Sequence, residues 1–259
     1  MVVSSTNRDI VVIHVPHSSS SVPADVRGEL KLSDVELELE LLRMTDWYTD
    51  ELFAQDDARF CPVVFEYSRL VCDVERFSDD AREPMSARGM GAIYERTSDG
   101  RPLRNRMDSE ARNAYLARYY NPHHRKLQEL VDGVLARQQH CLIVDCHSFG
   151  TPLRCDFDQS LSRPDICIGT DSTHTPAELV RRIERACSAV GLSFFLNRPF
   201  AGTMVPLKHF GRDLRVKSVM IEVNRGLYID LDTGSKLASF GSVREKIRGI
   251  LLALRLQSE

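Results

Sequence analysis

We expect no segment that would direct the chain to a membrane or out of the cell. Its first residues lack the basic stretch and apolar core of a secretory signal. No apolar run approaches the roughly 20 residues that a membrane helix needs. We therefore expect a cytoplasmic protein with no membrane partner.

Several chemical signatures are also missing. The seven cysteines form no CxxC pair, so neither a disulfide framework nor a thiolate zinc site is expected. Four catalytic or nucleotide-binding motifs are absent: GxSxG, HExxH, the P-loop and the dinucleotide-binding GxGxxG. Any chemistry must therefore come from other residues.

The composition is that of a globular protein. The chain has 259 residues, of which 42% are hydrophobic and 27% charged. No Pro/Gly/Ser-rich or charged stretch could serve as a linker, so we expect one catalytic domain spanning residues 1–259. A net charge of −3 argues against a nucleic-acid partner but leaves room for a local basic pocket.

Short apolar runs alternate with longer helical patterns along the chain. Strands are expected at residues 10–15, 62–67 with 70–74, 141–146, 166–169, 192–196 and 216–223. This order predicts an α/β single domain, in which a mostly parallel or mixed central sheet is flanked by helices. A functional site is expected outside the carboxyl ends of the strands.

Capping boxes predict where three helices begin. They lie at residues 33–36, 175–178 and 242–245, and the first should open a helix that runs toward Phe53. Gly191 is the expected end of the second helix. A further helix over residues 115–135 should be interrupted or kinked at Pro122. The irregular stretch 78–106 is long enough to suggest a functional loop.

Histidines mark two strand ends. His17 lies just past the first strand in a serine-rich turn, whereas His14 is still on the strand and is expected to be a hydrogen-bonded structural residue. The strand at 141–146 runs directly into Asp145 and His147. Two strand-end histidines are half of a zinc or other divalent-metal site, so His17 and His147 are the expected ligands.

The segment SRLVCDVERF offers the remaining metal ligand. As a strand it would place Arg69, Val71, Asp73 and Glu75 on one side, with Arg76 just beyond. Asp73 is the preferred third ligand. Glu75 is the fallback, although a salt bridge with an arginine is the stronger interpretation of its charge.

A glutamate inside an apolar strand is the expected catalytic base. Glu222 lies in VMIEVNRGLY, where burial should raise its pKa toward neutrality. Arg225 follows at the strand end and could hold a carboxylate bidentately. Together with Arg69 and Arg76, it predicts a pocket for a small dicarboxylate.

These segments resemble the N-formylglutamate amidohydrolase (deformylase) family over nearly the whole chain. The matching phrases are HVPHSS, MTDWYTDELF, SRLVCDVERF, EPM with GMGAIYERT, YYNPHH, IVDCHSFG, RPDICIGTD, NRPFAGTMVP and MIEVNRGLY. The resemblance implies a zinc-carboxypeptidase-like (phosphorylase/hydrolase-like) fold. It also implies hydrolysis of N-formyl-L-glutamate to formate and L-glutamate, a step of histidine degradation.

The resemblance carries over to particular residues. His17 and His147 match the two histidine ligands, and Glu222 matches the base. The glutamate ligand that follows the first histidine in the wider fold is absent here, which leaves Asp73, with Glu75 or His14 as alternatives. Two other functions stay open: an amidase or carboxypeptidase-like hydrolase for another acidic N-acyl amino acid, and a non-catalytic binder of an acidic metabolite.

Overall fold

Six strands form one mixed sheet in a computed structural model that describes residues 9–254. The strands are β1 (Val11–Val15), β2 (Phe60–Val64), β3 (Cys141–Phe149), β4 (Ile166–Gly169), β5 (Phe194–Leu196) and β6 (Val216–Asn224), in the spatial order β2-β1-β3-β6-β4-β5. Strands β2, β1, β3 and β6 are parallel, while β4 runs antiparallel to β6 and parallel to β5. The expected α/β single domain with a mostly parallel mixed sheet is confirmed.

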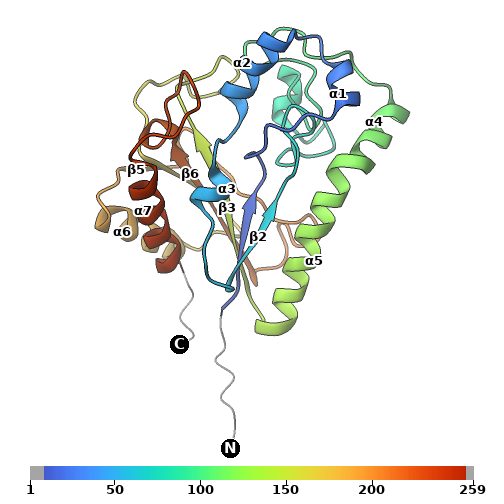
Figure 1. Cartoon of the computed structure of the whole chain (residues 1–259). Coiled ribbons are helices and arrows are strands. Elements are labelled where there is room, and N and C mark those ends of the chain that lie inside the picture. Colours follow the sequence, from blue (N-terminus) through green and yellow to red (C-terminus); the bar gives the residue numbers. More distant parts are fainter. Residues whose placement is uncertain (1–8, 255–259) are drawn as a thin grey trace, which may run out of the picture.

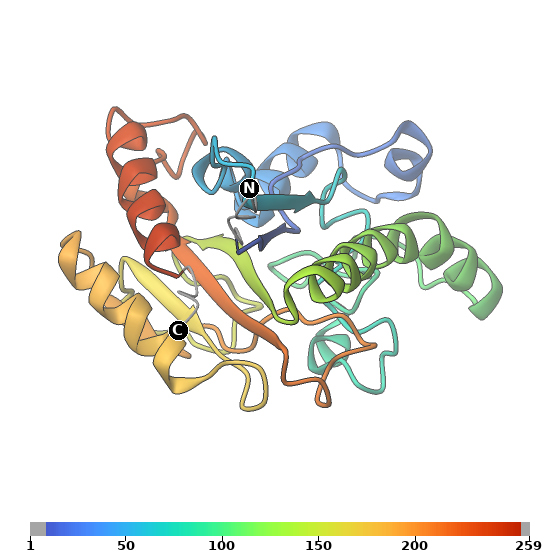
Figure 2. The ribbon, with the colours of Figure 1, turned by 90° about the horizontal axis from the view of Figure 1, so that it is seen from below.

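Helices cover both faces of this sheet (Figures 1 and 2). They are α1 (Ala24–Glu29), α2 (Asp34–Met44), α3 (Thr49–Leu52), α4 (Ser109–Tyr115), α5 (Asn121–Gln138), α6 (Ala177–Ala189) and α7 (Phe240–Ala253). Helix α5 packs on one face, and α3, α6 and α7 pack on the other. Short 3-10 segments lie at Pro84–Arg88 and Arg225–Leu227. No helix within residues 9–254 is long and apolar enough to cross a membrane.

The face covered by α5 changes from apolar to polar along each central strand. Val12 of β1 and Ile143 of β3 pack in the core with helix α5. Side chains alternate across a strand, so His14, Asp145 and His147 lie on this same face nearer the carboxyl ends. The core therefore fills the amino-terminal half of this face and leaves its carboxyl end for polar groups.

The segment expected to be a strand at residues 70–74 is a series of turns. Local side chains compete for its backbone: the Leu70 amide donates to Ser68 Oγ at 3.2 Å, and the Glu75 amide donates to Asp73 Oδ1 at 3.0 Å. The strand prediction was therefore wrong here. The expected placement of Arg69, Asp73 and Glu75 on one side of a strand fails with it.

The capping predictions succeeded once. At Ser33 the full box is present, since the Glu36 amide donates to Ser33 Oγ and the Ser33 amide donates to the Glu36 carboxylate. The helix ends at Met44 rather than continuing toward Phe53. Near residue 175 the helix forms without a box, because Thr175 Oγ1 donates to a sheet carbonyl instead.

Other helix boundaries moved by a few residues. Helix α7 begins two residues before Ser242, whose hydroxyl donates back to the Ser239 carbonyl rather than capping. Gly191 follows the end of α6 with a φ of 69°, a conformation that suits glycine. The expected interruption at Pro122 takes the form of a π-helical segment, Leu116–Tyr120, just before it.

The two serines give a matched test of the capping geometry. Ser33→Ala removes a hydroxyl that caps α2 and is expected to lower the free energy of unfolding by about 1 kcal/mol. Ser242→Ala removes a hydroxyl within the first turn of α7 and should leave stability nearly unchanged. Urea unfolding of both variants measures the difference. Equal losses would contradict the assignment of the cap.

Candidate metal and catalytic site

A cavity of about 540 Å³ opens at the carboxyl ends of the central strands. Most of the site residues expected from the sequence line it: His17, Arg69, Arg76, His147, Glu222 and Arg225. Parallel strands end at the same edge of a sheet, so residues distant in sequence meet there. The expected location of the site is therefore the location of this cavity.

His17, Asp46 and His147 place three ligand atoms around one point. His17 follows β1, Asp46 lies between α2 and α3, and His147 is near the end of β3. The Nδ1 atoms of the two histidines are 3.2 Å apart. Asp46 Oδ2 is 3.1 Å from His147 Nδ1 and 3.6 Å from His17 Nδ1. All three side chains are buried.

These separations fit a tetrahedral metal site. Zinc binds histidine nitrogen and carboxylate oxygen at about 2.0–2.2 Å, and tetrahedral angles then put ligand atoms about 3.3–3.6 Å apart. The observed 3.1–3.6 Å triangle lies close to this range. The remaining ring nitrogens point away from the triangle and toward other carboxylates. This group could therefore hold a divalent ion and leave a coordination position facing the cavity.

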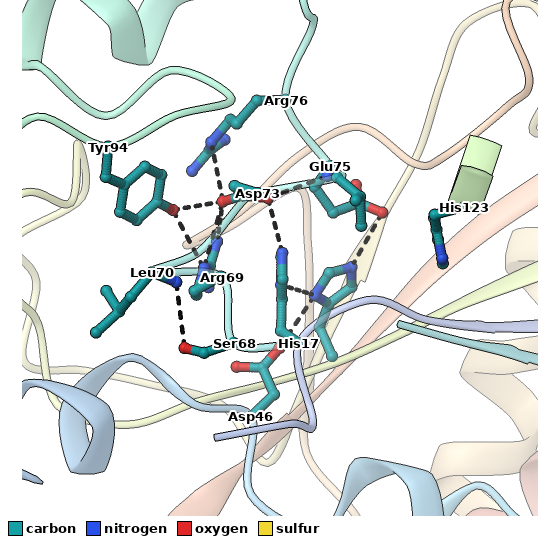
Figure 3. Close-up of polar contacts among 12 residues, drawn as sticks. His17, Asp46, Ser68, Arg69, Leu70, Asp73, Glu75, Arg76, Tyr94 and His123 are labelled. Carbon is teal, nitrogen blue, oxygen red and sulfur yellow. Dashed lines mark hydrogen bonds and ion pairs between the residues drawn. The ribbon is translucent and has the colours of Figure 1, made fainter. Parts of the chain in front are cut away.

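Asp73 contacts the far side of His17 rather than joining the triangle. Its Oδ1 is 2.8 Å from His17 Nε2. Figure 3 shows Asp73 between His17 and a second set of partners, Arg69, Arg76 and Tyr94. An outer carboxylate of this kind fixes the ring orientation and tautomer of a histidine ligand. The geometry thus gives Asp46 the position expected for Asp73.

The other two alternatives for the third ligand lie together behind His147. His14 Nδ1 is 2.8 Å from Asp145 Oδ1 and 3.1 Å from Glu75 Oε1. Asp145 Oδ1 is also 3.1 Å from His147 Nε2. Asp145 thus contacts Nε2 of His147 in the same way that Asp73 contacts Nε2 of His17. His14, Glu75 and Asp145 form a second group of potential ligand atoms that shares no residue with the first.

Negative charge exceeds positive charge in this cluster. Apart from Glu222 and Arg225, whose opposite charges offset each other, its little-exposed carboxylates are Asp46, Asp73, Glu75 and Asp145, and its guanidinium groups are Arg69 and Arg76. The fixed charge is therefore two units negative, which one divalent cation would balance. Buried charge without a counter-charge is costly, so the imbalance favours such an ion.

The histidine pKa values respond to the same imbalance. Burial would lower the pKa of His14, but its hydrogen bonds to Asp145 and Glu75 raise it to about 9. The pKa of His147 lies well above its usual value, because the attraction of Asp145 and its hydrogen bonds outweigh burial. In the protein without metal, protons on these rings supply part of the missing positive charge.

Glu222 lies next to the triangle with an uncommitted oxygen. It is the register partner of His147 in the β3–β6 ladder and lines the cavity. Its Oε2 is buried and has no hydrogen-bond partner. Burial raises the pKa of Glu222 to about 8. A carboxylate held in this way can exchange a proton near neutral pH.

The three cavity arginines expected to bind an acidic group, Arg69, Arg76 and Arg225, are held differently. Arg69 donates to Asp73 and Tyr94, and Arg225 donates through Nη1 to the Arg43 and Thr45 carbonyls. In Arg76 and Arg225, Nε is buried without a hydrogen-bond partner. Each can therefore donate to an acidic group in the cavity, whereas Arg69 is largely committed to Asp73.

Asp46 is the site residue that the sequence did not reveal. It follows helix α2 in the segment Met44-Thr45-Asp46-Trp47, where a polar pair interrupts apolar residues. That interruption was the available signal. What brings Asp46 to the histidines is a long-range contact, since its amide donates to the His17 carbonyl at 3.0 Å.

Comparisons with known proteins agree with this architecture. A family model described as N-formylglutamate amidohydrolase matches residues 10–229. The N-formylglutamate amidohydrolase from Ralstonia eutropha JMP134 superposes with a TM-score of 0.77 at 24% identity, over 95% of this chain and 92% of that chain. The gene product Atu2144 from Agrobacterium tumefaciens gives 0.62 at 20% identity, over 94% and 90%. No curated protein matches.

Asp73→Asn tests how strongly the outer carboxylate supports the fold. It leaves Arg69 without its buried counter-charge and is expected to lower the free energy of unfolding by about 3–5 kcal/mol. Urea unfolding in excess chelator keeps metal binding out of the comparison. The control is Asp34→Asn, whose ion pair with Arg27 is exposed and whose loss should change little. Equal effects of the two changes would contradict this account.

Proposed function

The chain belongs to the N-formylglutamate amidohydrolase family, and from this premise we propose that it hydrolyses N-formyl-L-glutamate to L-glutamate and formate. Family membership itself indicates an amidohydrolase. The observation that carries the proposal is the His17, Asp46 and His147 triangle beside Glu222 in a cavity with two available arginines. A metal site, a proton acceptor and a binding site for an acidic substrate thus meet in one place.

We assign the metal to the triangle of ligand atoms. His17 and His147 would bind zinc, or another divalent ion, through Nδ1, and Asp46 through a carboxylate oxygen. When bound, this ion would polarise the formyl group and favour deprotonation of water. Asp73 and Asp145 would orient the two rings from behind.

Glu222 moves the proton in this scheme. Its carboxylate takes a proton from the water that attacks the formyl carbon. The same group then gives that proton to the amide nitrogen as the carbon–nitrogen bond breaks, so that formate and the free amine leave. A positive charge beside His147 would bring the pKa of Glu222 down from about 8 and favour the ionised base.

Arg76 and Arg225 orient the substrate. Each has a buried Nε–H without a hydrogen-bond partner, although that of Arg76 lies 3.5 Å from Asp73 Oδ2. A guanidinium edge can bind a carboxylate through two parallel hydrogen bonds. The glutamate moiety has two carboxylates, one for each arginine. Arg69 contributes positive charge to the cavity while it remains bonded to Asp73.

One observation favours a broader acyl specificity as the second candidate. The cavity wall includes apolar side chains in addition to the arginines, among them Met85, Met90, Phe157 and Phe200. Such a wall would also accept a larger acyl group on an acidic amino acid. N-Acetylglutamate and longer N-acylglutamates are therefore the substrates that compete with N-formylglutamate for this assignment.

Metal content tests the ligand assignment. We expect purified protein to bind one zinc per chain, and Asp46→Asn and His147→Ala to lose it. Asp73→Asn should retain the metal with weaker affinity, by about 10- to 100-fold, as an outer carboxylate does. Elemental analysis and chelator competition measure both quantities. Full retention by Asp46→Asn with loss in Asp73→Asn would restore Asp73 as the ligand.

Formate release tests the reaction and the base together. Zinc-loaded protein should release formate and L-glutamate in equal amounts from N-formyl-L-glutamate. Glu222→Gln should keep the metal and the fold but lose roughly 10²- to 10⁴-fold in kcat. The control is Glu40→Gln, a buried carboxyl that accepts from Ser98, which should affect stability rather than kcat. Near-normal turnover by Glu222→Gln would rule out the base.

A further inference from the structure

Four buried side chains form a hydrogen-bonded row behind the proposed metal site. His123 of helix α5 and His14 of β1 approach through their Nε2 atoms at 2.8 Å. His14 Nδ1 is 2.8 Å from Asp145 Oδ1, which is 3.1 Å from His147 Nε2. Each of the four is at most 6% exposed. The row therefore connects helix α5 to a proposed metal ligand across two strands.

Hydrogen-bond chemistry fixes the direction of this row. Asp145 is a carboxylate, so both His14 Nδ1 and His147 Nε2 must donate to it. One proton lies between His14 Nε2 and His123 Nε2, whichever ring carries it. Nδ1 of His147 is then left with its lone pair for an ion. The tautomer that a metal requires is thus set from behind the site.

Asp145 accepts hydrogen bonds from three donors in three separate stretches of the chain. Oδ1 accepts from His14 and His147, and Oδ2 accepts from the backbone amide of Met204 at 2.8 Å. Removing His14 would take away one of the two donors to Oδ1 and leave the Met204 amide as the one hydrogen bond in this set that holds the carboxylate independently of His147. His14 is therefore the side-chain donor, other than His147 itself, that contacts Asp145.

We propose that His14, itself held by His123, is a positioning residue that keeps Asp145 aimed at Nε2 of His147 and so determines how tightly the site retains its metal. This inference rests on the metal site of the proposed function, but not on the identity of the substrate. It assigns a role to His14 other than that of a metal ligand. It also gives helix α5 a function beyond covering the sheet.

A second ion at His14, Glu75 and Asp145 is the competing interpretation, because their ligand atoms also lie close together. The fixed charge of the four carboxylates and two guanidinium groups favours a single ion instead. One divalent ion already balances the excess of two negative charges, and a second would leave the buried cluster two units positive. The stoichiometry of bound metal separates the two interpretations.

The experiment compares zinc dissociation constants by chelator competition in four proteins. His14→Leu removes the donor to Asp145 and is expected to weaken zinc binding by about 10- to 100-fold. His14→Asn places an amide N–H where Nδ1 was and should restore most of the affinity. His174→Leu removes another buried histidine, one that bonds the Val216 carbonyl, and should leave zinc affinity unchanged. Wild-type protein should bind one zinc.

Other results would overturn the proposal or pass the decision to further variants. Wild-type affinity in His14→Leu would show that His14 does not act on the metal. Two zinc ions in wild type and one in His14→Leu would make His14 a ligand. If His14→Leu fails to fold, His14→Asn and His123→Phe decide: tight binding by the first with weaker binding by the second supports the proposal, and unchanged binding by His123→Phe contradicts it.

The same proteins separate this proposal from the proposed function. Wild-type protein that binds one zinc but releases no formate from N-formylglutamate would refute the substrate and leave the positioning role to be judged on zinc affinity alone. Wild-type protein that binds no zinc would refute both the metal site and the role of His14.

Discussion

A surplus of buried negative charge is the constraint on which the rest of the site depends. Asp46, Asp73, Glu75 and Asp145 lie within one cluster at the end of the sheet, and only two guanidinium groups lie among them. The fold tolerates this arrangement if a divalent cation completes it. The two histidines and Asp46 form a group of ligand atoms that could hold that cation. The charge of the cluster and the geometry of its ligand atoms therefore both favour a divalent ion at this edge of the sheet.

The sheet brings these charged residues together because side chains alternate between the two faces of each strand. Along the α5-facing side of β1 and β3, apolar residues give way to His14, Asp145 and His147 as each strand approaches its carboxyl end. The opposite side stays apolar and packs against α6 and α7. One set of strands thus builds the core at one end and the site at the other. A shift of one residue in register would exchange the two faces.

Much of this arrangement could be predicted from the sequence, because strand patterns are local. The apolar runs of β1, β3 and β6 alone predict that His17, His147 and Glu222 lie at one edge of the sheet. Asp46 could not be predicted in the same way, since its place depends on where α2 ends and on its amide bond to the His17 carbonyl. The strand predicted in the segment SRLVCDVERF does not form. The side chains of Ser68 and Asp73 accept hydrogen bonds from backbone amides two residues later, which leaves those amides unavailable for pairing in a sheet.

The coordination of the bound ion tests the central claim most directly. A crystal structure of the zinc-loaded protein, with the anomalous signal collected at the zinc edge, would locate the ion and its ligands. The account predicts one zinc at about 2.0–2.2 Å from Nδ1 of His17, Nδ1 of His147 and a carboxylate oxygen of Asp46. Asp73 and Asp145 should remain on the far nitrogens of the two rings. Zinc bound by Asp73, or between His14 and Glu75, would contradict it.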